Sequence, residues 1–357
     1  MVRKRIVIFG WANSVHVQRW AEGIRDRGYE VKVISLDGQP IQGCETVNFS
    51  RKGRWSYITH ESAAVREALD FKPDLIHVHY VTGFGLWGIR SRFSPTVVSV
   101  WGADVVDFPS NWWRRRWIKY ILKKATHITA TSEFLRKTTL SLLTPNKQQI
   151  SVIPFGVKIP DTAMALPNKR SVKICFIKAH KPKYGPDILI KAMKRVVAVV
   201  PNISLSIAGE GYMTSELMQL TSELDLKDCI DFVGFVPNNK IYSFLQQHHF
   251  MVMPSVMDSE SFGVAVIEAA ACGRPVIASR VGGVSEVLRD GQTGILVQPK
   301  DINELSTAII QLSLEVDTCK KMGLEAYNFA KQNYSWDQSL DKMTDLYERL
   351  IYEASQA

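Results

Sequence analysis

The sequence predicts an α/β protein with two doubly wound parallel sheets, one in each half of the chain. Short apolar segments alternate with helical patterns along its length, which is typical of parallel sheets covered by helices. The 357 residues suffice for about two domains. Residues 160–170 lie between the two series of strands and helices. This stretch has two prolines and little hydrophobic pattern, which predicts a linker.

The first half predicts an N-terminal domain over residues 1–160. Short buried strands are expected at 6–9, 31–35, 75–79, 96–100 and 127–131, with a last strand from residue 149. Helical patterns separate them at 17–27, 57–69 and 113–124.

The second half predicts a domain over residues 171–335, with strands at 173–177, 204–208, 230–233, 250–254, 276–279 and 294–297. Helices are expected at 186–199, 215–224 and 240–247 and within 260–272. Residues 336–357 predict a long amphipathic helix with no strand after it. Ligands of such sheets bind beyond the carboxyl ends of the strands, so we expect the site in a cleft between the domains.

Composition excludes several classes of protein. Hydrophobic residues at 46% and charged residues at 22% are ordinary globular values, which argues against disordered and fibrous proteins. No apolar run approaches the roughly 18 residues that cross a bilayer, and the apolar start at 6–9 is too short for a signal peptide. The five scattered cysteines predict neither disulfides nor a metal site, which favours the cytoplasm.

Charge is distributed unevenly along the chain. Residues 1–155 hold 23 Lys and Arg against 12 Asp and Glu, a balance of +11, whereas the remainder holds 21 against 23. The first half is therefore expected to face an anionic partner, either a nucleic acid or an acidic membrane surface.

Two glutamates, Glu260 and Glu268, lie in a frame that suits a nucleotide-sugar. An apolar strand ends at Pro254, a polar loop follows, and an apolar helix begins after Gly263. Backbone N–H groups at such a helix start can bind a phosphate, and two carboxylates can accept hydrogen bonds from sugar hydroxyls on either side of it. Alternatively, the two glutamates are surface residues that flank a core helix.

This frame, with the segment Gly-Arg-Pro-Val-Ile-Ala-Ser-Arg-Val-Gly-Gly-Val-Ser-Glu from Gly273 to Glu286, resembles the donor site of retaining glycosyltransferases of family 4. The resemblance implies the GT-B fold, two Rossmann-like domains facing across a cleft, with the helix at 336–357 packing back on the first domain. It also implies that Glu260 meets the transferred sugar and Glu268 the ribose. The phosphates would meet the backbone of Ser261, Phe262, Gly263 and Val264.

A basic loop is expected to neutralise the diphosphate. Lys178 and Lys183 follow the first strand of the second domain and resemble the family's phosphate-binding loop, with Lys178 where many relatives have Arg. With Glu260 they form the expected catalytic set, and neither a metal nor another cofactor is expected. The resemblance adds Gly209 in a glycine turn beside the nucleotide and Val236 in the loop that holds the base. Alternatively, the loop that carries Lys178 and Lys183 is an ordinary basic loop in solvent, without a ligand.

Acceptor contacts are expected in the first domain. Asn13, Ser14 and His16 follow the first strand, although His16 can equally be a helix-start residue packed on the sheet. Trp101 and Asp104 lie in a segment similar to the family's His-Gly-x-Asp, with Trp101 in place of the histidine, so that the role of the histidine is not carried over. Trp101 can instead stack on a sugar, and Asp104 can bind an acceptor hydroxyl. His77 and His79 are interpreted as buried structure.

The most conspicuous basic and aromatic stretch lies at residues 111–124. Its candidate membrane-contact residues are Trp113, Arg114, Arg115, Arg116 and Trp117. Aromatic and basic residues on one helix suit the headgroup layer of an anionic membrane, in which case a lipid-linked acceptor is expected. Alternatively, the helix packs its tryptophan side on the sheet and leaves its arginines in water.

We therefore predict a retaining, metal-independent glycosyltransferase. It would move a sugar from a nucleoside diphosphate to a saccharide or lipid-linked acceptor in cell-envelope polysaccharide or glycolipid synthesis. It would be cytoplasmic and peripheral on the inner face of the cytoplasmic membrane, without a nucleic-acid partner. The alternatives are a GT-B nucleotide-sugar epimerase or hydrolase and, in a different class, a basic nucleic-acid-binding protein.

Overall fold

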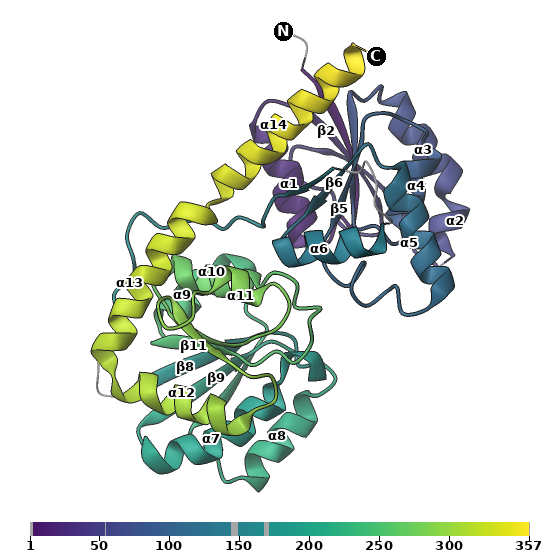
Figure 1. The fold of residues 1–357 in the computed structure, drawn as a ribbon. Coiled ribbons are helices and arrows are strands. Elements are labelled where there is room, and N and C mark those ends of the chain that lie inside the picture. The colour runs from purple at the N-terminus through teal and green to yellow at the C-terminus, as the bar shows by residue number, and fades with distance from the viewer. Residues whose placement is uncertain (1–2, 54, 144–148, 168–170, 357) are drawn as a thin grey trace. The chain divides into compact units, whose positions relative to one another are not determined.

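The computed structural model describes residues 3–53, 55–143, 149–167 and 171–356. It contains two compact units, one formed by Met1–Pro154 with Asp337–Ala357 and the other by Phe155–Trp336. In each unit helices cover a parallel sheet (Figure 1). The predicted class, two doubly wound α/β units, is confirmed. Positions 168–170 of the predicted linker lie outside the described residues.

The first unit has a seven-stranded sheet in the order β3-β2-β1-β4-β5-β6-β7, and neighbouring strands pair in parallel. Its strands are β1 (Arg5–Phe9), β2 (Glu30–Leu36), β3 (Glu45–Phe49), β4 (Leu75–His79), β5 (Thr96–Val100), β6 (His127–Ala130) and β7 (Ile150–Val152). Strand β3 was not predicted. It is a half-exposed edge strand and lacks the apolar run by which the others were recognised.

The helices of this unit are α1 (Val15–Asp26), α2 (Ser56–Thr59), α3 (Glu61–Asp70), α4 (Phe84–Arg90), α5 (Trp112–Lys124), α6 (Glu133–Leu142) and α14 (Trp336–Ser355). The helix predicted at 57–69 is divided at His60. Helix α4 was missed because its two glycines hide the helical pattern. Both are packing sites, since a Cβ on Gly85 would lie 2.9 Å from Ile121 and one on Gly88 2.4 Å from Val78.

One face of this sheet is polar and is covered by α14. His77 lies 2.6 Å from the Ser99 hydroxyl through Nε2 and bonds the Tyr347 hydroxyl through Nδ1. Glu348 accepts a 2.6 Å hydrogen bond from Tyr29, and Arg27 pairs with Asp337 at 3.1 Å. The C-terminal helix therefore packs back on the first unit, as predicted, beside α1 (Figure 1).

The burial of His77 is expected to make the folded protein less stable in acid. Burial lowers the pKa of His77 to about 3, whereas an unfolded histidine titrates near 6.5. Between these values the unfolded chain binds a proton that the folded chain does not, so stability falls as the pH falls. We expect a loss of about 1.4 kcal/mol per pH unit from this group, starting below about pH 6.5.

Urea unfolding of wild type and His77→Gln between about pH 7.5 and 5 measures this effect. The variant should be less stable at neutral pH, because it loses the contacts with Ser99 and Tyr347, but its stability should fall less steeply in acid. His60→Gln, at a half-buried position outside this cluster, is the control and should keep the wild-type slope. Equal slopes for wild type and His77→Gln would contradict the assignment.

The second unit has a six-stranded parallel sheet in the order β10-β9-β8-β11-β12-β13. Its strands are β8 (Val172–Ile177), β9 (Ile203–Ala208), β10 (Ile230–Gly234), β11 (Phe250–Met253), β12 (Val276–Ser279) and β13 (Gly294–Val297). All six were predicted to within two residues. Their continuous apolar runs reflect a sheet that is covered on both faces.

The helices of this unit are α7 (Pro186–Val199), α8 (Thr214–Glu223), α9 (Ile241–Gln246), α10 (Val264–Ala271), α11 (Val284–Val287), α12 (Ile302–Leu314) and α13 (Val316–Asn333), with 3₁₀ turns η1 (Pro182–Tyr184) and η2 (Asn238–Lys240). Helices α7, α8 and α12 lie on one side of the sheet and α9 and α10 on the other (Figure 1). Leu189, Leu217 and Ile309 belong to the core on the first side.

A buried arginine ties the segment before the second unit's first strand to the end of α10. The Arg274 side chain is fully buried and donates hydrogen bonds only to backbone carbonyls among the described residues. These belong to Met164, Ala165, Leu245, Gln246 and Cys272, at 2.7–3.1 Å. The Gly-Arg-Pro segment that begins at Gly273 thus has a structural role here, which its sequence pattern did not reveal.

Candidate active site

Sheet order in the second unit brings the two predicted donor segments together. Strands β8 and β11 are neighbours and pair Phe250 with Ile174 and Met251 with Cys175. Because parallel strands end at the same edge, the loops that follow them also meet there. These loops carry Lys178 and Glu260, which are 82 positions apart in the sequence.

Lys178 and Glu260 form a nearly enclosed ion pair at this edge. The Lys178 ammonium lies 2.9 Å from Glu260 Oε1 and 3.0 Å from Oε2, so that both carboxylate oxygens face the same cation. The two side chains are only 18% and 10% exposed. The site thus holds one cation and one hydrogen-bond acceptor in contact, ready for an anionic ligand that also carries hydroxyl groups.

The surroundings keep Lys178 charged. Burial by itself lowers the pKa of the Lys178 ammonium. The charge of Glu260, with smaller contributions from Tyr184 and Glu268, outweighs burial and raises this pKa above its ordinary value. Lys178 is therefore a permanent positive charge in the physiological pH range.

Two glycines allow the backbone to approach both members of the ion pair. A Cβ on Gly209 would lie 2.1 Å from the Lys178 carbonyl oxygen, and a Cβ on Gly282 would lie 2.4 Å from that of Glu260. Both glycines have positive φ, +125° and +47°. Gly209, predicted to lie beside the nucleotide, thus also supports the strand end that carries Lys178. The role of Gly282 was not recognised from the sequence.

Gly282→Ala should impair the site without unfolding the protein. The added Cβ would meet the backbone oxygens of Glu260 and Asp258, at 2.4 and 2.5 Å, so the Glu260 loop must move. A displacement of about 1 Å can cost about 100-fold in rate, and we expect at least a tenfold fall in kcat/KM. Gly291→Ala is the matched control, because Gly291 also has positive φ but no atom within 4 Å of a Cβ. Equal losses of kcat/KM in Gly282→Ala and Gly291→Ala would show that strain at a positive φ, and not the contact with Glu260, is responsible.

The remaining predicted donor residues surround the start of α10. Gly263 has φ +84° and directly precedes the helix, and the buried Phe262 packs against Phe155 and Tyr334 with ring centroids 6.0 and 5.8 Å apart. Ser261 is buried, whereas Val264 and Glu268 are half-buried. Val236 is half-buried in the loop after β10.

The second predicted lysine shares an aromatic contact with the first. The ammonium groups of Lys178 and Lys183 lie 5.1 and 4.7 Å from the ring centroid of Tyr184. Tyr184 was missed in the sequence, where it stood only as part of a Tyr-Gly pair. No group of three or more His, Cys, Asp or Glu side chains that can hold a metal occurs among the described residues.

In the first unit the predicted acceptor residues lie in the loops after β1 and β5. Trp101 packs against His16 and against His79, with centroids 5.8 and 5.0 Å apart. Asp104 is fully buried, and its carboxylate accepts hydrogen bonds from the backbone N–H groups of Trp101, Gly102 and Val81. Its carboxylate therefore shapes the loop that presents Trp101, and an acceptor contact of Asp104 stays a prediction.

The other acceptor residues are more open. Asn13 is exposed, and Ser14 precedes α1 without a side-chain cap. His79, which was interpreted as structural, is buried and leaves Nδ1 without a partner among the described residues. The contact between His79 and Trp101 was not predicted, because the sequence of a strand does not indicate which loop will lie beside its last residue.

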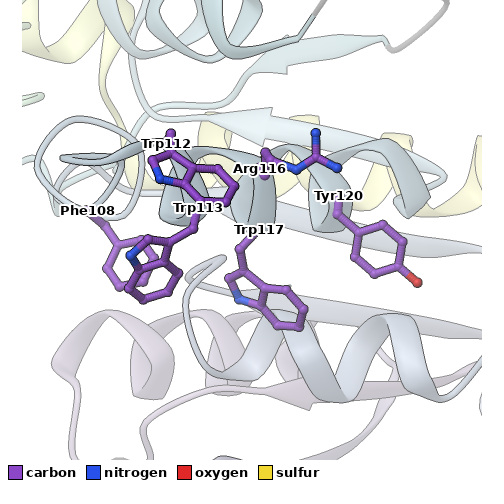
Figure 2. A pocket seen from close by; sticks show the side chains of 6 residues that line it. All are labelled: Phe108, Trp112, Trp113, Arg116, Trp117 and Tyr120. Carbon is purple, nitrogen blue, oxygen red and sulfur yellow. The ribbon is translucent and has the colours of Figure 1, made fainter.

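Helix α5 exposes its aromatic side. Ile118, Ile121 and Leu122 face the core, whereas Trp112 and Trp113 are 74% and 52% exposed. Trp117 is half-buried and packs against the core, so the alternative that the helix packs its tryptophan side on the sheet holds for Trp117 but not for Trp112 and Trp113. Figure 2 shows the rings of the helix, with Phe108 from the segment before it. They line a groove of about 530 Å³. The groove is lined by Phe108, Trp112, Trp113, Arg116, Trp117 and Tyr120.

The basic residues of α5 fall into two groups. Arg114 is held in place, because its guanidinium lies 5.3 Å from the rings of both Phe108 and Trp113 and donates to Ser110. Arg115 and Arg116 are exposed. Within the part of the chain that the structure describes, no helix is both long and apolar enough to cross a membrane.

The two parallel-sheet units are those of the GT-B fold, and comparison with known proteins agrees. HepE of Anabaena, solved in complex with UDP-glucose, superimposes with a TM-score of 0.83 at 18% identity, covering 97% of this chain and 100% of that one. Residues 162–329 match the family model of glycosyl transferases group 1, and residues 5–132 match that of glycosyl transferase 4-like proteins. The chain therefore belongs to the family-4-like glycosyltransferases.

Two relatives are similar to this protein over most of the chain. An uncharacterized glycosyltransferase of Methanocaldococcus jannaschii is 28% identical over 281 residues, which are 78% of this chain and 76% of the relative. The D-inositol 3-phosphate glycosyltransferase of Nocardia farcinica is 26% identical over 309 residues, 78% of this chain and 67% of the relative. The predicted family and the glycosyltransferase function are thus confirmed.

Proposed function

We propose that this glycosyltransferase transfers a sugar from a nucleoside diphosphate to a saccharide or lipid-linked acceptor, with retention of anomeric configuration and without a metal ion. The observation that carries the proposal is the Lys178–Glu260 pair, which lies at the carboxyl edge of the second sheet next to the start of α10. A diphosphate supplies the anion that Lys178 requires, and the sugar supplies hydroxyls for Glu260. The UDP-glucose complex of HepE supports a donor of this class.

The proposed reaction needs little proton chemistry from the protein. The bond between the sugar C1 and the phosphate oxygen breaks while the acceptor oxygen forms a bond to C1 on the same face. The proton of the acceptor hydroxyl passes to the leaving phosphate oxygen, so the atoms balance without a protein base. Lys178 and Lys183 stabilise the charge that develops on the diphosphate, the role that a metal ion has in other transferases.

A screen of UDP-, GDP- and ADP-sugars by thermal shift tests the proposal. A donor that binds only the folded protein raises its melting temperature. Turnover of that donor should require an added acceptor, resist a chelator and give a product with the donor's anomeric configuration. Donor consumption without acceptor would indicate the epimerase or hydrolase alternative. Loss of turnover with chelator would refute metal independence.

A peripheral position on an anionic membrane, and with it a lipid-linked acceptor in envelope synthesis, is part of the proposal. Its support is the exposed aromatic groove of α5 with Arg115 and Arg116 beside it and the balance of +11 in residues 1–155. Aromatic rings suit the interfacial layer, while cations attract anionic headgroups.

Arg115→Ser with Arg116→Ser should weaken binding to anionic vesicles at least tenfold, since each cation near such a surface contributes about 1 kcal/mol. Vesicles with and without phosphatidylserine, sedimented with the protein, measure this. Lys320→Ser with Lys321→Ser removes two exposed cations from α13 in the second unit and should have little effect. Unchanged sedimentation of the arginine variant would defeat the membrane proposal.

A further inference from the structure

The ring of Tyr184 contacts both lysines of the candidate donor site. Its centroid lies 5.1 Å from Lys178 Nζ and 4.7 Å from Lys183 Nζ. An aromatic face attracts ammonium groups within about 6 Å, and it does so without using up the hydrogen-bond donors of the cation. The contact with the ring therefore leaves the N–H groups of Lys183 for a ligand, whereas Lys178 already donates to both carboxylate oxygens of Glu260.

The two lysines depend on this ring to different degrees. Lys178 also has a carboxylate partner, Glu260. Lys183 takes part in no ion pair within the described residues, and its ammonium lies against the Tyr184 ring. A lysine side chain is long and flexible, and like charges repel each other. The ring is thus the group that keeps Lys183 beside Lys178 before any anion arrives.

The backbone fixes the place of the ring. Tyr184 ends the 3₁₀ turn η1, and its N–H bonds the carbonyl of Lys181 at 3.0 Å. Gly185 follows with φ +64°, where a Cβ would lie 2.2 Å from the Pro254 carbonyl oxygen. The Lys183 carbonyl accepts a 2.9 Å hydrogen bond from Val256. The turn is therefore attached to the loop that leads to Glu260, which fixes the backbone from which the ring projects.

We propose that Tyr184 is a positioning residue that presents the ammonium groups of Lys178 and Lys183 together to a single diphosphate. This inference rests on the proposed function, because it takes a nucleoside diphosphate as the ligand. The ring lowers the conformational entropy that Lys183 would otherwise lose when the donor binds. It contributes nothing to recognition of the nucleoside itself, so its effect depends on the number of phosphates.

The test compares Tyr184→Phe, which keeps the aromatic ring, with Tyr184→Leu, which keeps apolar bulk but removes the ring. Calorimetric titrations use the nucleoside diphosphate identified in the donor screen and the corresponding nucleoside. For Tyr184→Leu we expect the Kd of the diphosphate to rise about tenfold and that of the nucleoside to change less than about twofold. Tyr184→Phe should bind both like wild type. Tyr212→Leu, at a position 76% exposed in the same unit, is the matched control.

Kinetics provide a second measurement. Because both lysines also stabilise the leaving diphosphate, Tyr184→Leu should raise KM and lower kcat, and Tyr184→Phe should restore both. Equal weakening of nucleoside and diphosphate binding by Tyr184→Leu would indicate general damage to the site and overturn the inference. An equal loss of diphosphate binding in Tyr184→Phe would also overturn the inference, because it would assign the effect to the tyrosine hydroxyl. Failure of wild type to bind any nucleotide would instead refute the proposed function.

Discussion

Glu260→Ala is expected to abolish sugar transfer while the protein remains folded. The substitution removes the acceptor proposed for the sugar hydroxyls and leaves the Lys178 ammonium without the carboxylate that faces it at 2.9 and 3.0 Å. Loss of one such preorganised group costs about 100- to 1,000-fold in kcat, and we expect a fall in this range or larger. Initial rates with the identified donor and acceptor measure it.

The same substitution should also lower stability, which must be separated from the chemical effect. An ammonium left in a mostly buried place without its partner costs about 1–3 kcal/mol. Replacing both members, Lys178→Met with Glu260→Met, removes the charge and should recover most of the stability but none of the activity. Glu223→Gln, on the exposed side of α8, is the control for a lost carboxylate. Near-normal turnover of Glu260→Ala would refute the role assigned to it.

Arg274→Ala should cause the largest loss of stability of any single substitution considered. The fully buried guanidinium donates to the carbonyls of Met164, Ala165, Leu245, Gln246 and Cys272. Its removal leaves several buried acceptors unsatisfied, at about 1–3 kcal/mol each, together with a cavity. We expect the free energy of unfolding to fall by at least about 3 kcal/mol, measured from urea midpoints at constant m.

The shape of the guanidinium matters as well as its charge. Arg274→Lys keeps the charge but cannot reach five carbonyls in different directions, so it should recover only part of the loss. The control is Arg280→Ala, which breaks the half-exposed pair with Asp290 at 2.8 Å and should cost less than about 1 kcal/mol. If Arg274→Ala costs no more than Arg280→Ala, the carbonyl contacts do not stabilise the fold.

The sequence predicted those strands whose burial is visible in the chain itself. Strands β4 and β11 are fully buried, and their apolar runs were recognised almost to the residue. Strand β3 is half-exposed and α4 is interrupted by Gly85 and Gly88, so neither shows the period of its class. Burial by neighbours that are distant in the sequence decides such elements, and a local pattern does not report it.

In the candidate site, too, local motifs identified the residues but did not show which of them are in contact. Lys178 and Glu260 were both identified from local motifs, but their contact depends on β8 and β11 being neighbours in the sheet. The contact of Gly282 with Glu260 likewise depends on β11 and β12 being neighbours, whereas Tyr184 meets both lysines within the loop after β8. For α5 the sequence left two orientations open, because tryptophan and isoleucine are both apolar. In the structure Ile118 and Ile121 are buried and Trp117 packs beside them, whereas Trp113 is exposed.

The return of α14 to the first unit has a consequence for synthesis of the chain. The second unit is continuous from Phe155 to Trp336, whereas the first includes Asp337–Ala357. On the ribosome the later half of the nascent polypeptide can therefore complete its fold while the earlier half still waits for the helix that brings Tyr347 to His77. The sheet face around His77 therefore stays uncovered until α14 has been synthesised.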